Sequence, residues 1–185
     1  MTPLDPHPGA AFNPAPDPAE LAHLATRWVR WVARHRQPAN PIADRSGRHA
    51  GHHQPADVWF LAGTFGGSAQ RRCVVPAGRP LFFPAFNWWQ VGRTAEPAEP
   101  MDGATGHAQL DGVAVALSEA GSATSFPVRG FFNNVVTVWP WPMQVSCWGL
   151  WGLVPPPAPG QHELTFGGTD GGRFWVEAQY QIDVR

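Results

Sequence analysis

The sequence of 185 residues contains no lysine, and all 13 of its basic residues are arginines scattered along the chain. With 14 acidic residues the formal net charge is -1, so the chain has no basic stripe of the kind that holds nucleic acid. No window approaches the run of roughly 18 apolar residues that spans a membrane. We therefore expect neither a nucleic-acid partner nor a membrane partner.

The start of the chain lacks the features of a secretory signal. Residues 1–17 (MTPLDPHPGAAFNPAPD) contain neither a basic segment nor a long apolar one. Cysteine is also scarce, because Cys73 and Cys147 are the only two. They are too few for a disulfide framework and form either one bridge or two buried thiols. We expect a cytoplasmic protein with reduced thiols.

Glycine (20), proline (21), phenylalanine (11) and tryptophan (10) are abundant, whereas tyrosine occurs once. The length predicts one domain with a single core. We divide the chain into a Pro-rich flexible tail over residues 1–17 and a single domain over residues 18–185. Within this domain we expect a helix over residues 18–37, a histidine-rich loop over residues 40–56 and a β-rich body over residues 57–185.

The helix is predicted from a capping signal and a periodic apolar face. Asp17 is a good N-cap, Pro18 suits the first turn, and Glu20 completes a capping box. Apolar residues follow at three- and four-residue spacing: Leu21, Leu24, Ala25, Trp28, Trp31 and Val32. We expect this face, with both tryptophans, to pack on a sheet.

After residue 55 the chain consists of short apolar or alternating runs separated by glycine and proline, which is typical of β-strands. The predicted strands cover residues 57–64, 72–75, 80–86, 112–117, 135–139, 145–154, 162–166 and 174–184. This spacing predicts a mainly β fold, an antiparallel β-sandwich or β-barrel with one N-terminal α-helix. Pro84, Pro140 and Pro142 place their segments at sheet edges or bulges. Residues 94–106 are predicted to form a polar surface loop.

Distinctive motifs follow one another from residue 28 onward. The first are Trp28 and Trp31, Asn40-Pro41 with Asp44 and Gly47, Gln54, and VWFLAGTFGG over residues 58–67. Then come Arg71 or Arg72 with Cys73, Pro76 and Gly78, FFP over residues 82–84 with Asn87, PGQHELTFGG over residues 159–168, and YQIDV over residues 180–184. With these motifs the chain resembles a family of uncharacterised bacterial proteins that has no settled activity, so the resemblance implies a fold more than a function. Relatives often carry a cysteine upstream of the glutamine, where this chain has GRHAGHHQ, so the resemblance implies no bridge for Cys73.

The histidine-rich loop is one candidate for chemistry. His49, His52 and His53 lie within five residues, and imidazoles are common ligands of zinc and other divalent transition metals. Asp44 or Asp57 would supply an oxygen ligand or a partner for an imidazole. Without a metal, His52 or His53 beside Asp44 or Asp57 would serve as a general acid or base. A solvated or hydrogen-bonded structural loop is the third reading.

The tryptophan clusters are the other candidate. The core cannot bury all ten tryptophans together with eleven phenylalanines, so we expect some of them to line a pocket or an exposed platform. The predicted substrate-binding residues combine these rings with polar neighbours: Asn87, Trp88, Trp89, Arg93, Trp139, Trp141, Trp148 and Trp151. A pocket of this kind would suit an extended apolar molecule or a sugar ring stacked on indole.

Three functions follow from these candidates. The first is a cofactor-free cyclase or isomerase of bacterial specialised metabolism, which binds a largely apolar small molecule in a Trp/Phe-lined cavity with acid/base assistance. The second is a metal-dependent enzyme that uses His49, His52 and His53. The third is a non-catalytic carbohydrate-binding module with tryptophan platforms. A small-molecule ligand is the expected partner, with a homodimer as a further possibility.

Overall fold

The computed structural model describes residues 16–37 and 39–185, so the predicted tail over residues 1–17 lies almost wholly outside the described residues. The described elements are α1 (Pro18–Ala33), β1 (Trp59–Phe60), β2 (Gly67–Val75), β3 (Leu81–Gly92), β4 (Thr105–Leu110), β5 (Val113–Ala114), β6 (Leu117–Gly121), β7 (Phe126–Val128), β8 (Met143–Val154), β9 (Gly160–Thr169) and β10 (Trp175–Val184). No described helix has the length and apolar character needed to cross a membrane.

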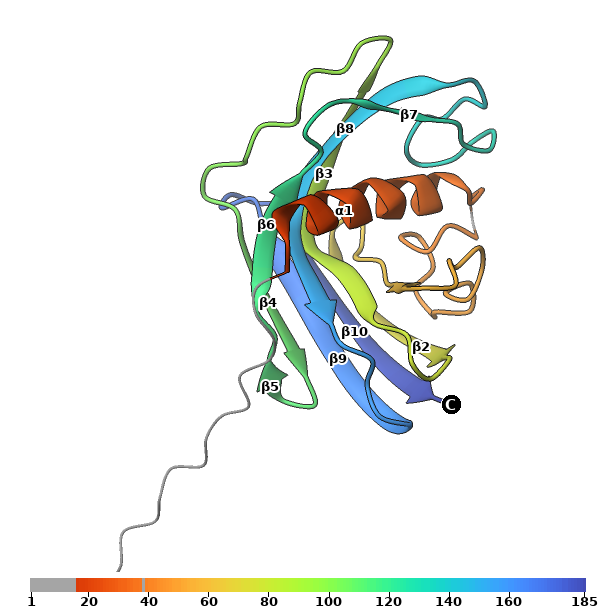
Figure 1. Cartoon of the computed structure of the whole chain (residues 1–185), viewed down its shortest axis with the longest axis vertical. Helices are drawn as coiled ribbons and strands as arrows, with labels where there is room; N and C mark the ends of the chain where they lie inside the picture. Colours follow the sequence, from red (N-terminus) through yellow and green to blue (C-terminus); the bar gives the residue numbers. More distant parts are fainter. Residues whose placement is uncertain (1–15, 38) are drawn as a thin grey trace, which may run out of the picture.

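The strands form two five-stranded sheets (Figure 1). The first has the order β1-β3-β8-β6, with β7 also paired to β8, and the second has the order β2-β10-β9-β4-β5. Most pairs are antiparallel, but β1 runs parallel to β3 and β2 runs parallel to β10. The described strands leave both sheets open. The fold is therefore the predicted single-domain sandwich and not the barrel, but its sheets are mixed, whereas the sequence predicts antiparallel ones.

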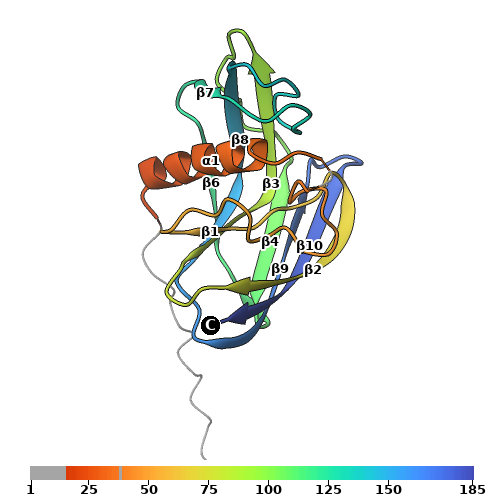
Figure 2. The same cartoon turned by 90° about the vertical axis from the view of Figure 1, so that its right-hand side faces the viewer.

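The helix adds a third layer. It crosses the outer face of the first sheet, as the two views at right angles show (Figures 1 and 2), while the inner face packs on the second sheet. Alternate residues of β3 serve the two faces, because Phe82 belongs to the core under the helix whereas Leu81 and Phe83 belong to the core between the sheets. A single strand thus joins both cores.

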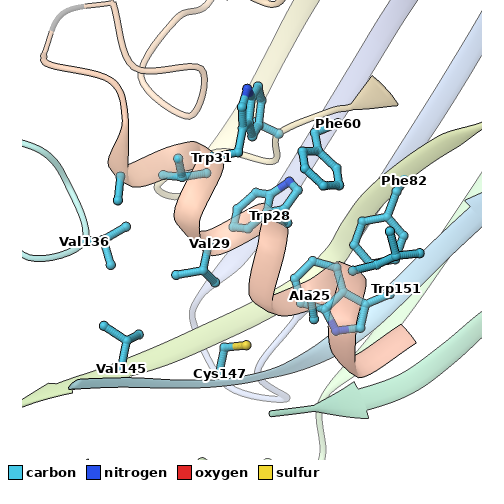
Figure 3. Close-up of a cluster of buried hydrophobic side chains, with 14 of the residues drawn as sticks. Ala25, Trp28, Val29, Trp31, Phe60, Phe82, Val136, Val145, Cys147 and Trp151 are labelled. Atoms are coloured by element: carbon cyan, nitrogen blue, oxygen red, sulfur yellow. The ribbon is translucent and has the colours of Figure 1, made fainter. Parts of the chain in front are cut away.

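The core under the helix is built from the predicted apolar face (Figure 3). The Trp28 ring meets the edge of the Trp151 ring, with centroids 5.6 Å apart, and Trp151 stacks on Phe82 at 5.0 Å. Indole nitrogens here are satisfied, since Trp28 Nε1 donates to the Leu61 carbonyl at 2.8 Å and Trp151 Nε1 donates to the Ala120 carbonyl at 2.9 Å. The prediction that the helix tryptophans pack on a sheet is confirmed.

In the core between the sheets, the Phe166 ring stacks on both Phe83 and Tyr180. The ring centroids are 4.5 Å apart in the first pair and 5.9 Å apart in the second. The cysteines are apart from each other in these layers, and both are free thiols. Burial raises the pKa of Cys73 to about 12 and that of Cys147 to about 11. Both thiols therefore stay protonated near neutral pH, which suits packing and not nucleophilic chemistry.

One predicted strand is absent from the structure. Residues 135–139 form turns, because the Asn134 side chain takes over the hydrogen bonding of the following backbone. Its Oδ1 accepts from the backbone N–H groups of Val136 and Thr137, both at 2.8 Å, and its Nδ2 donates to Thr137 Oγ1. Asparagine competes with strand formation in this way. Similarly, the predicted strand over residues 112–117 is split between the short β5 and the start of β6.

Candidate functional site

A cavity of about 400 Å³ lies at an unpaired edge of β3. Because β1 pairs only with Leu81 and Phe82, no described strand covers this edge beyond Phe82. The lining residues come from α1, from the loops around β1, from β3, from the loop between β3 and β4, from the turn between β9 and β10, and from the start of β10: Trp28, Ile42, Gly63, Thr64, Phe65, Pro84, Ala85, Phe86, Asn87, Trp88, Trp89, Met101, Asp170, Phe174 and Val176.

The local sequence of β3 explains why the strand edge is irregular here. The register of β3 against β8 shifts between Pro84 and Phe86, and a shift of this kind bends a strand and increases its twist. Pro84 has no N–H to offer to a neighbouring strand, so the prediction that it lies at an edge or bulge is confirmed. Consecutive residues project to opposite faces, yet Asn87 and Trp88 both line the cavity. The cavity therefore borders both faces of β3.

Aromatic side chains form much of the cavity wall. Trp28 is buried and lies on the helix side, whereas Phe65 and Phe174 are 52% and 42% exposed and so mark the opening. Flat rings stack on planar apolar groups. Cavities that hold small molecules measure about 300 to 1,000 Å³, so this one has the size and lining of a small-molecule site.

Two polar atoms in this wall have no partner. Asn87 Nδ2 and Trp88 Nε1 are both buried, and neither makes a hydrogen bond to any described residue. A buried donor without an acceptor costs about 1–3 kcal/mol. Native proteins satisfy most such groups, so these two neighbouring donors, on residues that line the same cavity, are candidate contacts for an acceptor from outside the chain.

The other polar side chains of the cavity serve its loops. Thr64 Oγ1 donates to the Gly67 carbonyl at 2.9 Å, and Asp170 Oδ1 accepts from the backbone N–H groups of Gly172 at 2.7 Å and Phe174 at 3.3 Å. Asp170 thereby shapes the turn that carries Phe174. Among the described residues that line the cavity, Asp170 is the only one with an ionisable side chain.

A smaller cavity of about 120 Å³ adjoins the first. The two share Ile42, Thr64 and Phe65 as lining residues. The smaller one is more polar, because Arg45, Ser68 and Arg71 also line it, together with Ala43, Gly66 and Ala69.

Arg71 holds the loops of both cavities in place. Its side chain is almost wholly buried, and its Nε donates to the Asp44 carbonyl at 2.6 Å while Nη2 donates to the Ile42 carbonyl at 3.0 Å. Nη1 donates to the carbonyls of Ala62 and Gly63 and to the Tyr180 hydroxyl, and Tyr180 Oη in turn donates to the Ala62 carbonyl at 2.9 Å. The segments that carry Ile42 and Gly63 are thus fixed against the second sheet.

No family model, no curated protein and no solved structure matches this chain. The function has to be inferred from the site itself. The two adjoining cavities, one aromatic and one beside a buried guanidinium, are the candidate site.

The predicted substrate-binding residues are distributed over the larger cavity, the buried clusters, the end of β3 and the loop between β7 and β8. Asn87, Trp88 and Trp89 line the larger cavity. Trp151 is buried in the core under the helix, and Trp148 is buried in a separate small cluster with Phe86 and Ala98, where its Nε1 donates to Glu119 Oε1 at 2.9 Å. The exposed Arg93 follows β3 and lines neither cavity, and Trp139 and Trp141 lie in the loop between β7 and β8.

Trp139 and Trp141 form an exposed pair. They are 47% and 54% exposed, and their rings stack with centroids 5.1 Å apart and planes 7° apart. Phe132 lies against Trp139 at 5.7 Å. The Asn134 side chain orders the turn that carries this pair. Asn134 Nδ2 donates to Thr137 Oγ1, and Thr137 Oγ1 in turn donates to the Trp139 carbonyl at 2.9 Å.

His49, His52 and His53 lie in the part of the histidine-rich loop that packs at the C-terminal end of α1, and they line neither cavity, although Ile42, Ala43 and Arg45 of the same loop do. Trp31 Nε1 donates to the His52 carbonyl at 2.9 Å, and the ring centroids of His49 and His52 are 5.0 Å apart. His35, which the sequence did not single out, lies 5.1 Å from His53, and burial lowers its pKa. Within residues 16–37 and 39–185, no three His, Cys, Asp or Glu side chains are placed to hold a metal ion. A metal site and an acid/base role for His52 or His53 stay predictions.

The two predicted carboxylate partners of these histidines have other partners. Burial acts to raise the pKa of Asp44, but the hydrogen bonds its carboxylate accepts from His49 N, Ser46 and nearby backbone lower it overall. Asp57 forms an ion pair with Arg27, with Oδ2 and Nη1 2.8 Å apart, and this contact lowers its pKa. Asp44 orders its own loop, and Asp57 ties the following strand to the helix.

Several cavity residues escaped the sequence analysis, notably Phe65, Met101, Asp170 and Phe174. Phe65 and Phe174 each adjoin a glycine-rich turn, in TFGG and in TDGGRF. An aromatic residue beside such a turn is the signal that could have found them, because a turn exposes a ring that a strand would bury. Met101 lies within the predicted polar loop over residues 94–106 and carried no such signal.

Proposed function

We propose that this protein binds a small, largely apolar molecule that carries a hydrogen-bond acceptor, in the cavity at the edge of β3. The observation that carries this proposal is the pair of buried, unpartnered donors, Asn87 Nδ2 and Trp88 Nε1, in an aromatic cavity of about 400 Å³. Each donor would gain a partner when a small shift of its side chain opens it to a carbonyl or similar group in the cavity. A ligand that satisfied both would recover most of the cost of burying them.

The aromatic walls support a flat ligand. Trp28, Trp88 and Trp89 contribute indole rings to the wall, and the half-exposed Phe65 and Phe174 stand where such a molecule would enter. Stacking on such rings contributes about 0.5–1.5 kcal/mol beyond the area buried. The apolar groups therefore supply affinity, while the two donors select for an acceptor.

A shape-matched pair of probes tests the proposal. Titration calorimetry would compare 2-acetonaphthone, which has a carbonyl acceptor, with 2-ethylnaphthalene, which lacks one. We expect the ketone to bind about fivefold to tenfold more tightly, as one net hydrogen bond predicts. Asn87→Leu should reduce this difference, whereas Trp139→Ala, outside the cavity, should leave it unchanged. Failure of both probes, and of larger planar ketones, to bind would refute the proposal.

The predicted cyclase or isomerase activity requires a proton donor or acceptor beside the bound molecule. Asp170 is the group of this kind that lines the cavity, so it replaces His52 and His53 as our proposed acid/base residue. In a screen of apolar substrates, Asp170→Asn should abolish turnover while keeping affinity for 2-acetonaphthone. Unchanged turnover in this variant would exclude Asp170 from catalysis.

A second candidate function rests on the exposed Trp139–Trp141 pair. Parallel, half-exposed indoles present a flat face on which a sugar ring can stack, so we propose a carbohydrate-binding surface as the alternative. Affinity electrophoresis in gels that contain soluble polysaccharides would test it. Retardation that is lost in Trp141→Ala and kept in Trp89→Ala supports this function, and equal mobility of all three proteins in every gel refutes it.

A further inference from the structure

We infer that the ligand is an apolar carboxylic acid whose carboxylate binds in the smaller cavity beside Arg71. This inference rests on the proposed ligand cavity and adds the identity of the polar end of the ligand. The positive charge of Arg71 is not balanced within the described fold. Arg71 is 2% exposed, and guanidinium stays protonated at any physiological pH. Yet within the described part of the chain no carboxylate lies within 4.0 Å of its nitrogens.

The partners of Arg71 are neutral. They are four backbone carbonyls and the hydroxyl of Tyr180, and the carboxylate of Asp44 turns instead to Ser46, Gly47 and His49. Buried charges in proteins are usually paired. Carbonyl dipoles satisfy the hydrogen bonds of a guanidinium but leave its net charge in place, so an anion at this position would be strongly favoured.

The guanidinium also has an N–H to offer. Nη2 carries two hydrogens and donates to one described acceptor, the carbonyl of Ile42 at 3.0 Å. Ile42 lines both cavities, and Arg71 lines the smaller one. Because Arg71 lines the smaller cavity, we place this remaining N–H toward it, where a carboxylate oxygen could accept it.

The surroundings fit a carboxylate at the end of an apolar body. A second positive charge, Arg45, lines the smaller cavity from the surface and donates from Nη2 to the Ser68 carbonyl at 3.0 Å. The smaller cavity, about 120 Å³, is large enough for a carboxylate and its adjoining methylene group. Its neighbour, about three times as large and mostly apolar, would hold the rest of the molecule.

The test compares two probes that differ only in charge, 2-naphthylacetate and 2-naphthylacetamide, by titration calorimetry on the full chain at neutral pH. The acid should bind at least about tenfold more tightly than the amide, as one charge-assisted hydrogen bond predicts. Arg45→Gln should lower the affinity for the acid by about twofold to threefold, since an exposed charge contributes little. The affinity for the amide should stay unchanged. The matched control is Arg72→Gln, an exposed arginine next to Arg71 that projects to the other face of β2.

Arg71→Met removes the charge but also the loop contacts, so circular dichroism must first show that it folds. If it folds, the preference for the acid should disappear, and a preference that persists overturns the inference. If Arg71→Met does not fold, the affinities of the wild type and of Arg45→Gln for the acid and the amide test the inference instead. Equal binding of acid and amide to the wild type refutes the carboxylate subsite while the ligand cavity stands, whereas no binding of either probe refutes the proposed function as well.

Discussion

The unpartnered amide of Asn87 makes a prediction that needs no ligand. Its Nδ2 is buried and donates to no described residue, so replacing Asn87 by leucine, which has nearly the same shape, removes an unsatisfied donor from the cavity wall. Eliminating such a group recovers about 1–3 kcal/mol of desolvation cost. For a chain of this length, each kcal/mol raises Tm by about 2–4 °C. Asn87→Leu should therefore be more stable than the wild type and bind ligand less well.

Differential scanning calorimetry would measure Tm, and urea unfolding would measure the free energy of unfolding. Asn134→Leu is the matched control. The Asn134 side chain donates to Phe131 O and Thr137 Oγ1 and accepts from two backbone N–H groups, so its loss should destabilise the fold by about 1–3 kcal/mol. A rise in Tm for the first variant and a fall for the second are expected. A lower Tm for Asn87→Leu than for the wild type would refute the claim that this amide is kept at a cost in stability.

Three further changes test the framework around the site. Tyr180→Phe removes the buried hydroxyl that links β10 to the cavity loops, and urea unfolding should show a loss of about 1–3 kcal/mol. Gly152→Ala would place a Cβ 2.3 Å from the Phe83 ring, so it should cost about 1–3 kcal/mol or more; a neutral result would contradict the packing. The hydrogen bond with Asp111 raises the pKa of His162, so its stabilisation is complete below about pH 6.5 and is lost as pH rises through the folded pKa. Urea titrations on either side of this window should show a fall in stability with pH that is smaller in Asp111→Asn.

The helix and the last strand could be predicted because their signals are local. Asp17 Oδ1 accepts from Ala19 N at 3.0 Å, as its capping role requires, and the helix ends at Ala33, four residues before the predicted end. In β10 the buried residues alternate strictly from Val176 to Val184. A helix cap and an alternating apolar pattern depend only on neighbours in the sequence, so tertiary contacts did not alter these two elements.

The location of the site could be predicted only in part. A tryptophan in a strand has the same sequence pattern whether it faces a core or a cavity. Trp151 is covered by Trp28 of α1, whereas Trp88 lines the cavity. The free edge of β3 arises because β1 is only two residues long, although the predicted strand covers residues 57–64. The buried Arg71 was noted only as part of a motif, because no local pattern reveals that a charged side chain in an alternating strand will project inward.

The parallel pairing of β2 with β10 has a kinetic consequence. It joins Gly67–Val75 to residues 176–184, so the sheet that anchors Arg71 to Tyr180 can form only after a loop of about a hundred residues has closed. Closing loops of this length slows folding far more than it lowers stability. Until that closure, the exposed edge of β10 offers its unpaired backbone to any other chain. We therefore expect refolding yield to fall with rising protein concentration, even where the folded protein is stable.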